Sequence, residues 1–180
     1  KIVKHAASTY ACETPVTDGK HVYVYYGMHG VYCYDMKGSL VWNKDLGTFK
    51  TLRDWGTGSS PTLYNNVLYI QLDNEEKSFI VALDALSGKE KWRKDRDEKT
   101  TYGTPVIWEN NLRTELVALG SAARSYDPNT GDLLWEVKNI KGRSTPSPVF
   151  DKQHIYFGNP GGRRDPGSFF AVKAGAKGDI

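Results

Sequence analysis

The stretch ALDALSGKEKW, residues 82–92, is an apolar run that ends in an aspartate, followed by a Ser-Gly turn and a charged segment with one tryptophan. The same order returns 43 residues later as SYDPNTGDLLW, residues 125–135. An aspartate that closes one strand, a glycine with positive φ in a tight turn and a tryptophan on the returning strand are typical of a β-hairpin. Because the whole pattern recurs, the chain contains an internal repeat.

Alignment of the chain with itself gives four units, and a proline follows the first residue of each, which are Thr14, Ser60, Thr104 and Ser147. The four prolines are 46, 44 and 43 residues apart, and each unit has room for about four short strands. Four strands at this period are typical of a β-propeller blade. We therefore predict an all-β fold, a β-propeller of four-stranded antiparallel blades, with about four blades in the chain. We expect a single partial propeller domain over residues 1–180, with repeat units at about 14–46, 60–96, 104–138 and 147–180.

An Asp–Gly–Trp set recurs in three of the units. We interpret these residues as structural: Asp35, Gly38, Trp42, Asp84, Gly88, Trp92, Asp127, Gly131 and Trp135. Large aromatic side chains at fixed repeat positions are usually packing residues, so we expect the three tryptophans to lie between blades. The fourth unit ends where its tryptophan strand would follow. Residues 1–9 could supply that strand or belong to a preceding blade.

Composition limits the alternatives. The chain has 180 residues with 18 glycines and 8 prolines, which favours many short elements over long helices. It has no apolar run of about 18 residues, so we expect no transmembrane segment. Its net charge is +3 and residues 89–99 mix both signs, so nucleic acid is not an expected partner. The chain starts at a lysine without a signal segment, which predicts a start created by processing or truncation.

The two cysteines, Cys12 and Cys33, are too far apart for a metal-binding CxxC pair. Two buried thiols are the favoured interpretation, and one disulfide is the alternative in an oxidising compartment. The four histidines show no HExxH spacing, and the sequence has no nucleophile elbow. We therefore predict no catalytic residue and no metal site.

The repeated hairpins resemble the A-x-D-x-x-[ST]-G-x-x-x-W repeat of the pyrroloquinoline-quinone (PQQ)-like β-propeller family, and the resemblance covers nearly the whole chain. The chain looks most similar to uncharacterised, exported members of that family. The resemblance implies an eight-bladed ring, of which about half is present, and a periplasmic or extracellular location. Four blades cannot close such a ring. Further blades of the same protein are the favoured completion, and a second copy of the chain is the alternative.

The strands of a blade are lettered A to D from the axis outward, so the D–A and B–C connections share one face of the propeller. In this chain those connections are the longer ones and are rich in Glu, Arg, Asp and Trp. Binding residues concentrate in such loops on rigid scaffolds. The candidate ligand-binding residues are Glu13, Arg53, Trp55, Asn74, Glu75, Arg124, Arg143 and Arg163. The alternative for each is a solvated charge or an ion pair between blades.

Two of these connections have alternatives of their own. Trp55 lies outside the Asp–Gly–Trp pattern, and it either stacks on a ligand or fills the funnel where blades converge, the second being favoured. Asn74, Glu75 and Glu76 form an oxygen-rich cluster. Their spacing differs from that of a dedicated calcium loop, so we expect a solvated acidic turn.

Three functions fit these features. The favoured one is a non-catalytic, exported propeller without a cofactor, which binds a protein or small-molecule ligand, or acts as a scaffold, through the D–A and B–C loops. The resemblance also includes quinoprotein dehydrogenases, which would require PQQ and calcium. Here the adjacent-cysteine pair of that group is missing, and neither a base nor a full calcium set can be assigned. The third is the outer-membrane assembly factor, a lipoprotein whose anchoring cysteine follows a signal peptide, whereas Cys12 lies in a propeller connection.

Overall fold

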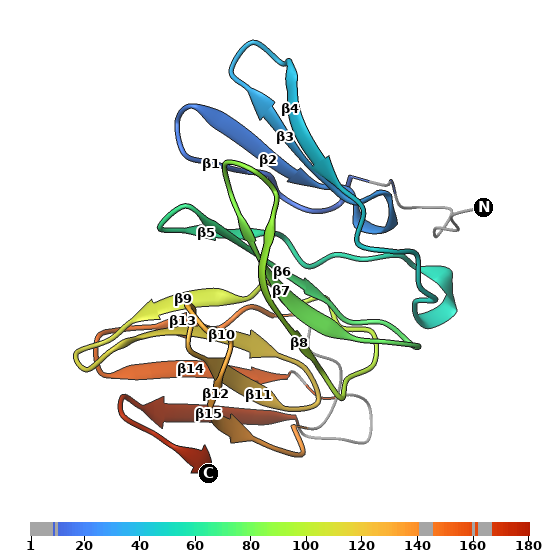
Figure 1. The fold of residues 1–180 in the computed structure, drawn as a ribbon. Helices are drawn as coiled ribbons and strands as arrows, with labels where there is room; N and C mark the ends of the chain where they lie inside the picture. The colour runs from blue at the N-terminus through green and yellow to red at the C-terminus, as the bar shows by residue number, and fades with distance from the viewer. Residues whose placement is uncertain (1–8, 10, 141–145, 160, 162–166) are drawn as a thin grey trace. The chain divides into compact units, whose positions relative to one another are not determined.

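The computed structural model describes residues 9, 11–140, 146–159, 161 and 167–180. Within these residues the chain is all-β, with sixteen strands and two single-turn 3-10 helices (Figure 1). It divides into two compact units, Lys1–Thr100 and Thr101–Ile180, and each contains two of the four predicted repeats. Neither short helix has the length of a membrane span, so the described residues contain no candidate transmembrane helix. That the four repeats form one domain stays a prediction.

The first unit contains two four-stranded antiparallel sheets. The first sheet has the order β1 (Val16–Thr17), β2 (His21–Tyr25), β3 (Val31–Asp35) and β4 (Leu40–Lys44). The second has the order β5 (Thr62–Tyr64), β6 (Val67–Leu72), β7 (Phe79–Asp84) and β8 (Glu90–Asp95). The 3-10 helices are η1 (Gly27–His29), between β2 and β3, and η2 (Leu52–Asp54), between β4 and β5. Chain order and spatial order agree in both sheets, as in a propeller blade.

The second unit contains a five-stranded and a three-stranded sheet. The larger sheet contains β9 (Val106–Glu109), β10 (Thr114–Leu119), β11 (Ala123–Tyr126), β12 (Leu133–Val137) and, beside β12, β16 (Gly178–Asp179). The smaller sheet contains β13 (Val149–Phe150), β14 (His154–Asn159) and β15 (Ser168–Lys173).

The predicted fold class is confirmed, and the second unit adds one detail that the sequence did not predict, the place of β16. β16 runs parallel to β12 and pairs Gly178 with Trp135. The Ile180 amide donates to the Glu136 carbonyl at 3.1 Å. The final residues therefore extend the sheet of the third repeat, and β15 is the outermost strand of the fourth sheet among the described residues. Residues 1–8, the other candidates for a fourth strand, lie outside the described residues.

The core of the first unit lies between its two sheets. It contains Tyr23, Tyr25 and Cys33 from the first sheet, and Leu68 and Ile70 from the second. Each of these side chains is buried. Because side chains alternate along a strand, the intervening residues of β2 and β6 lie on the outer faces of the same two sheets.

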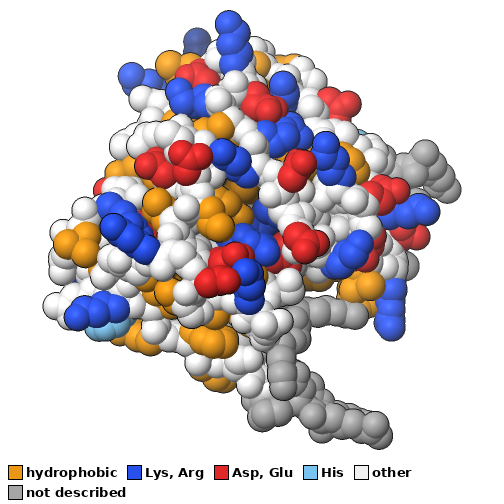
Figure 2. Space-filling view, turned by 60° about the horizontal axis from the view of Figure 1, so that its bottom comes forward, with side chains coloured by type: hydrophobic (Ala, Val, Ile, Leu, Met, Phe, Trp, Pro, Cys, Tyr) orange, Lys and Arg blue, Asp and Glu red, His pale blue; other side chains and the backbone are white. Residues whose placement is uncertain are grey.

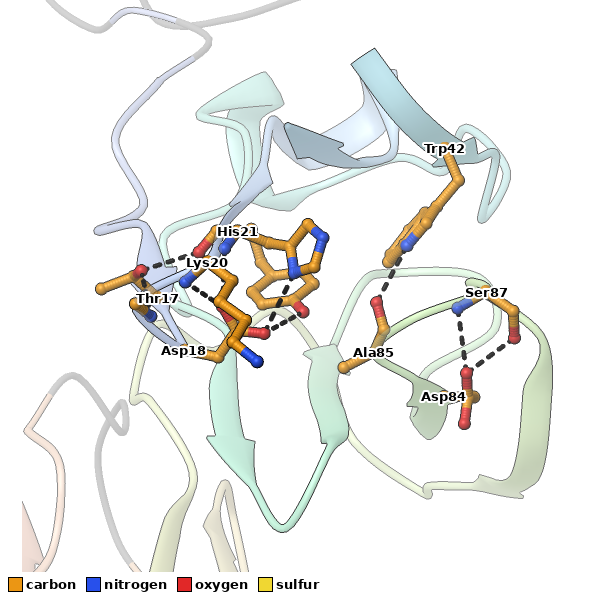
Figure 3. A network of polar contacts seen from close by, with 10 residues as sticks. Thr17, Asp18, Lys20, His21, Trp42, Asp84, Ala85 and Ser87 are labelled. Atoms are coloured by element: carbon orange, nitrogen blue, oxygen red, sulfur yellow. Dashed lines mark hydrogen bonds and ion pairs between the residues drawn. The ribbon is translucent and has the colours of Figure 1, made fainter. Parts of the chain in front are cut away.

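Trp42 joins the two sheets of this unit. Its Nε1 donates to the carbonyl oxygen of Ala85 at 2.9 Å (Figure 3), and its ring lies 6.2 Å from that of Tyr23. Gly88 has a φ of +68°, and a Cβ added there would lie 2.7 Å from Cε3 of Trp42. Glycine is therefore required both by the turn and by the close approach of the indole.

Two buried tryptophans stabilise the second unit. Trp135 stacks on Phe157 of β14, with ring centroids 6.3 Å apart. Trp108 of β9 donates from Nε1 to the carbonyl oxygen of Asp151 at 2.6 Å. Trp108 lies outside the Asp–Gly–Trp pattern, so its contact with the fourth repeat was not predicted.

The C–D turns have the geometry that their glycines predict. Gly38, Gly88 and Gly131 have φ values of +85°, +68° and +73°. The Asp84 carboxylate accepts hydrogen bonds from the amide and the hydroxyl of Ser87, at 2.9 and 2.7 Å (Figure 3). The aspartate therefore closes the turn that the glycine permits.

The two cysteines are not joined by a disulfide. Cys33 is buried in the core of the first unit, and burial raises the pKa of its thiol to about 11. Cys12 is exposed, and its Sγ hydrogen-bonds the carbonyl oxygen of Thr9 at 3.2 Å. The prediction of two buried thiols is therefore wrong for Cys12.

Candidate functional site

Glu75 joins two connections of the first unit, the D–A connection that contains η2 and the B–C connection between β6 and β7. Its Oε1 accepts hydrogen bonds from the amide and the hydroxyl of Thr100, at 3.1 and 2.6 Å. The Thr100 hydroxyl oxygen accepts a hydrogen bond from the Leu52 amide at 2.9 Å. The structure therefore brings Glu75 to the segment that carries Arg53 and Trp55.

Asn74 is buried and shapes its own turn. Its Oδ1 accepts hydrogen bonds from the amides of Glu76 and Lys77, at 2.8 and 2.6 Å. Its Nδ2 donates to the carbonyl oxygens of Leu72 and Lys77, at 3.3 and 2.7 Å. Because both ends of the amide are engaged by the backbone, this geometry favours loop shaping over contact with a ligand.

The η2 segment carries Arg53 and Trp55 on an unusual backbone. Arg53 and Asp54 have φ values of +53° and +56°, two consecutive non-glycine residues in the left-handed region. Strain of this kind costs about 1–3 kcal/mol per residue and persists only where the surroundings enforce it. The Asp54 amide donates to the Thr51 carbonyl at 3.0 Å, and the Gly56 amide donates to Thr51 Oγ1 at 2.9 Å. The Arg53 guanidinium lies 5.6 Å from the ring centroid of Trp55, which is a cation–π distance.

Glu13 is buried where three connections of the first unit meet. Its Oε1 accepts a hydrogen bond from the Thr57 hydroxyl. Burial raises the pKa of Glu13, although the bond from Thr57 opposes part of the rise. Burial and the nearby Glu13 charge also raise the pKa of Tyr25. A Cβ at Gly27 of η1 would collide with Thr57 Oγ1, so glycine makes room for this cluster.

A buried ion pair beside these loops was missed by the sequence analysis. Arg96 donates from Nε and Nη2 to the carboxylate of Asp73, at 2.8 and 3.2 Å, and both side chains are fully buried. Gln71 donates to the same carboxylate at 2.7 Å. The partners are 23 residues apart in sequence, so no local pattern links them. The pair fixes the start of the B–C connection, because Asp73 directly follows β6.

Among the remaining predicted site residues, Arg124 does not join this group. Arg124 lies on β11, where its Nε donates to Glu136 Oε2 at 3.2 Å. Its predicted place in a B–C loop is therefore wrong, because the strand begins at Ala123. Arg143 and Arg163 lie outside the described residues.

Glu115 of β10 is a second buried carboxylate that was missed. Its Oε2 accepts hydrogen bonds from Trp135 Nε1 and Ser125 Oγ, at 2.6 and 2.5 Å. Its Oε1 accepts hydrogen bonds from Asn110 Nδ2 and Arg113 Nε, at 2.8 and 2.9 Å. Four donors surround the carboxylate, so it holds the sheet together. A glutamate inside the apolar run TELVAL was the available signal.

The A–B turns of the first and fourth repeats contain the same polar cluster. Asp18 Oδ2 accepts a hydrogen bond from the Tyr23 hydroxyl at 3.0 Å and lies 3.1 Å from His21 Nδ1 (Figure 3). Burial opposes the ionisation of Asp18, but hydrogen bonds from backbone amides and these side chains outweigh it and hold the pKa well below its ordinary range. In the fourth repeat, Asp151 accepts a hydrogen bond from the Tyr156 hydroxyl at 3.1 Å. Both clusters close turns.

The oxygen-rich cluster of residues 74–76 does not fit a calcium ion. Calcium takes about six to eight converging oxygen ligands. Here each side chain already accepts hydrogen bonds from the protein. Asn74 Oδ1 accepts them from two backbone amides, and Glu75 accepts one from the Thr100 hydroxyl. Glu76 Oε2 accepts one from the Lys50 amide at 2.8 Å. In the part of the chain that the structure describes, no three His, Cys, Asp or Glu side chains group as metal ligands.

Repeated sheets of short antiparallel strands define a partial β-propeller, and in the first unit Trp42 joins two of these sheets by lying on the glycine turn of the next one. A family model described as "Outer membrane protein assembly factor BamB" matches residues 4–120 and 77–165. The chain belongs to this family of PQQ-like β-propellers, as its repeat predicts. A search of curated proteins gave no significant match.

Solved structures show the same fold. Quinohemoprotein alcohol dehydrogenase from Comamonas testosteroni matches with a TM-score of 0.61 and 18% identity, over 81% of this chain and 28% of that one. BamB from Moraxella catarrhalis matches with a TM-score of 0.58 and 17% identity, over 91% of this chain and 45% of that one. A europium-containing methanol dehydrogenase matches with a TM-score of 0.52 and 21% identity, over 68% of this chain and 24% of that one. The chain thus spans less than half the length of each.

Proposed function

We propose that the chain is part of a non-catalytic, exported β-propeller that binds a protein partner through the D–A and B–C loops of its first unit. The matching family is described as an assembly factor for outer membrane proteins, and an assembly factor acts through contacts with other proteins. A periplasmic or extracellular location is part of this proposal.

The η2 segment is the observation that carries the proposal. Arg53 and Asp54 are exposed and Trp55 is half-buried. Arg and Trp are enriched among the residues that dominate the binding energy of protein interfaces. Hydrogen bonds to Thr51 and Thr100 already hold the strained backbone in place. A loop fixed before binding loses little conformational entropy on association, which favours its use as a binding element.

Binding of the purified chain to periplasmic domains of the outer-membrane barrel-assembly machinery tests this proposal. We expect Trp55→Ala and Arg53→Ala each to weaken binding about tenfold or more. Lys37→Ala is the matched control, because Lys37 is exposed on a C–D turn and should not contact the partner. Absence of binding by the wild-type chain, or equal affinity of all variants, would contradict the proposal.

The quinoprotein dehydrogenase alternative is supported by likeness of fold alone. The buried cation Arg96, which a quinone carboxylate could use, is held by Asp73. The carboxylates near η2 are likewise engaged by Thr57 and Thr100. Titration with PQQ and Ca²⁺ separates the two functions. If the protein is a dehydrogenase, the quinone should bind saturably. If it is a scaffold, no binding of the quinone is expected.

A further inference from the structure

The outer edge of β12 carries an additional strand. β16 lies parallel to β12, with Gly178 opposite Trp135 and Asp179 opposite Glu136. The Ile180 amide donates to the Glu136 carbonyl oxygen at 3.1 Å. Because that carbonyl group points to β16, the backbone of Glu136 faces away from β11. The outermost strand of one repeat therefore accepts an extended segment on its free edge.

β4 is the equivalent strand of the first repeat. The tryptophan of each strand lies opposite a residue that precedes a bulge, Cys33 in β3 and Ser125 in β11. The two strands therefore have the same register, and Asn43 corresponds to Glu136. By this register the backbone amide and carbonyl groups of Asn43 point away from β3. β4 is the outermost strand of its sheet, and in the described part of the chain no strand pairs with this edge.

The side chains at the start of the two strands are also alike. Leu40 of β4 and Leu133 of β12 both lie two residues before the tryptophan, and both are exposed. β8, the outermost strand of the second repeat, has Glu90 at this position, followed by Lys91. Charged side chains on an edge strand, lysine above all, disfavour the addition of a further strand. β4 therefore resembles the strand that accepts β16, whereas β8 does not.

The charge at the end of the strand differs between the two repeats. Lys138, which follows β12, forms ion pairs with Asp179 Oδ2 at 2.7 Å and with Glu136 Oε1 at 3.1 Å. After β4 the position of Lys138 is occupied by Asp45, which is exposed. Asp45 Oδ1 accepts the Gly47 amide at 2.8 Å, and Oδ2 has no hydrogen bond within the described residues. A segment that pairs with β4 therefore needs a cation where β16 has an aspartate.

Charges of both signs are mixed over the molecular surface. On the face turned forward in Figure 2, Lys and Arg side chains are interspersed with Asp and Glu, and hydrophobic side chains reach the surface between them. The net charge of +3 is likewise small for 180 residues. Long-range attraction of one sign is therefore weak, and single positions such as Asp45 decide which segment fits.

We propose that the outer edge of β4 binds an extended, basic segment of a partner protein by addition of a parallel strand. The backbone of the segment pairs with Asn43, an apolar side chain covers Leu40, and a Lys or Arg side chain pairs with Asp45. In recognition of this kind, main-chain hydrogen bonds supply affinity and side chains supply specificity. The contact is additional to that of η2 and does not depend on it.

A charge-reversal experiment with two peptides tests this contact. The probes are the acetylated and amidated peptide AGAKGDI, residues 174–180, and its Asp179→Lys form. Titration into the ¹⁵N-labelled chain, followed by ¹H–¹⁵N NMR at low salt, gives the dissociation constant and identifies the amides that shift. Asp45→Lys reverses the charge, and Asn43→Pro removes the outward N–H while the pairing with β3 is kept. Asp95→Lys is the matched control, because Asp95 is exposed at the end of β8.

The Asp179→Lys peptide should shift the amides of β4 and leave those of β8 unchanged. Asp45→Lys should bind this peptide about threefold more weakly and AGAKGDI about threefold more tightly than the wild-type chain does, as expected for one exposed ion pair. Asn43→Pro should bind either peptide about fivefold more weakly, because one hydrogen bond is lost. Asp95→Lys should bind as the wild-type chain does, and far-UV circular dichroism verifies that each variant folds.

Three results would overturn the proposal. The first is the absence of β4 shifts with both peptides, and the second is an equal shift of the β8 amides. The third is a preference between the two peptides that Asp45→Lys leaves unchanged.

Discussion

The indole nitrogen of Trp42 donates a hydrogen bond of 2.9 Å to the carbonyl oxygen of Ala85, 43 residues further along the chain. The donor lies on the last strand of one repeat, and the acceptor lies in the C–D turn of the next. The same indole also lies against Gly88 of that turn. One side chain therefore connects two neighbouring blades through a polar and an apolar contact.

Trp42→Phe should lower the free energy of unfolding by about 1 kcal/mol, because it removes this hydrogen bond and keeps an aromatic ring in the contact. Gly88→Ala should cost more, because it combines a left-handed backbone with a collision against the indole. Urea unfolding followed by circular dichroism measures both. If Trp42→Phe has the same urea midpoint of unfolding as the wild-type chain, the hydrogen bond contributes little to stability.

Glu115→Gln should destabilise the chain by about 3 kcal/mol or more. The amide cannot accept hydrogen bonds from all four donors, and its own NH₂ group would face two of them. Glu109→Gln is the control, because Glu109 is exposed on β9 of the same sheet. Thermal unfolding compares the two variants, and equal small effects would show that the Glu115 network contributes little.

The Asp73–Arg96 pair should show strong coupling in a double-mutant cycle. Asp73→Asn or Arg96→Gln alone leaves a buried charge without its partner and should cost about 3–5 kcal/mol. The double variant removes both charges, so its cost should be well below the sum of the single costs. Additive costs in urea unfolding would mean that the two side chains act independently.

Ionisation of Glu13 should lower the free energy of unfolding as the pH rises. Its pKa in the folded state lies above the ordinary value of 4.5, so its contribution is complete below about pH 4.5 and is lost as the pH rises through the folded-state pKa. Glu13→Gln keeps an acceptor for Thr57 and removes the charge. We therefore expect this variant to be more stable than the wild-type chain near pH 7 and equally stable near pH 4.

Asp18→Asn is the control of opposite sign. The pKa of Asp18 is lowered, so its stabilising contribution is present above the ordinary value of 3.8 and is lost as the pH falls. This variant should therefore be less stable than the wild-type chain near pH 7, with the difference narrowing in acid. If Glu13→Gln also lowers stability near pH 7, the Glu13 charge is compensated in the fold.

The fold was predictable because its determinants are local and repeated. The spacing of Asp84, Gly88 and Trp92 specifies a turn and the strand that returns from it, and recurrence of that spacing specifies the blade. The place of β16 was not predictable in the same way. Two residues carry no pattern of their own, and their pairing with β12 depends on which sheet edge is within reach.

The candidate site was predicted less completely, because its contacts join loops that are distant in sequence. Long, charged connections drew attention to Arg53, Trp55 and Glu75, which remain predicted binding residues. The sequence could not show that Thr100 would engage Glu75, or that Arg53 would adopt a left-handed backbone. Composition identifies a loop as polar, whereas the partner of each polar group is decided by the tertiary fold.

The most direct test of the proposed binding role is ¹⁹F NMR of the chain labelled with 5-fluorotryptophan. The chain has five tryptophans, so five resonances are expected, and Trp55→Phe identifies that of Trp55. Addition of a periplasmic domain of the barrel-assembly machinery should shift or broaden the Trp55 resonance and leave the other four unchanged. A Trp55 resonance that stays unperturbed while the partner binds would contradict the assignment of η2 as the binding element.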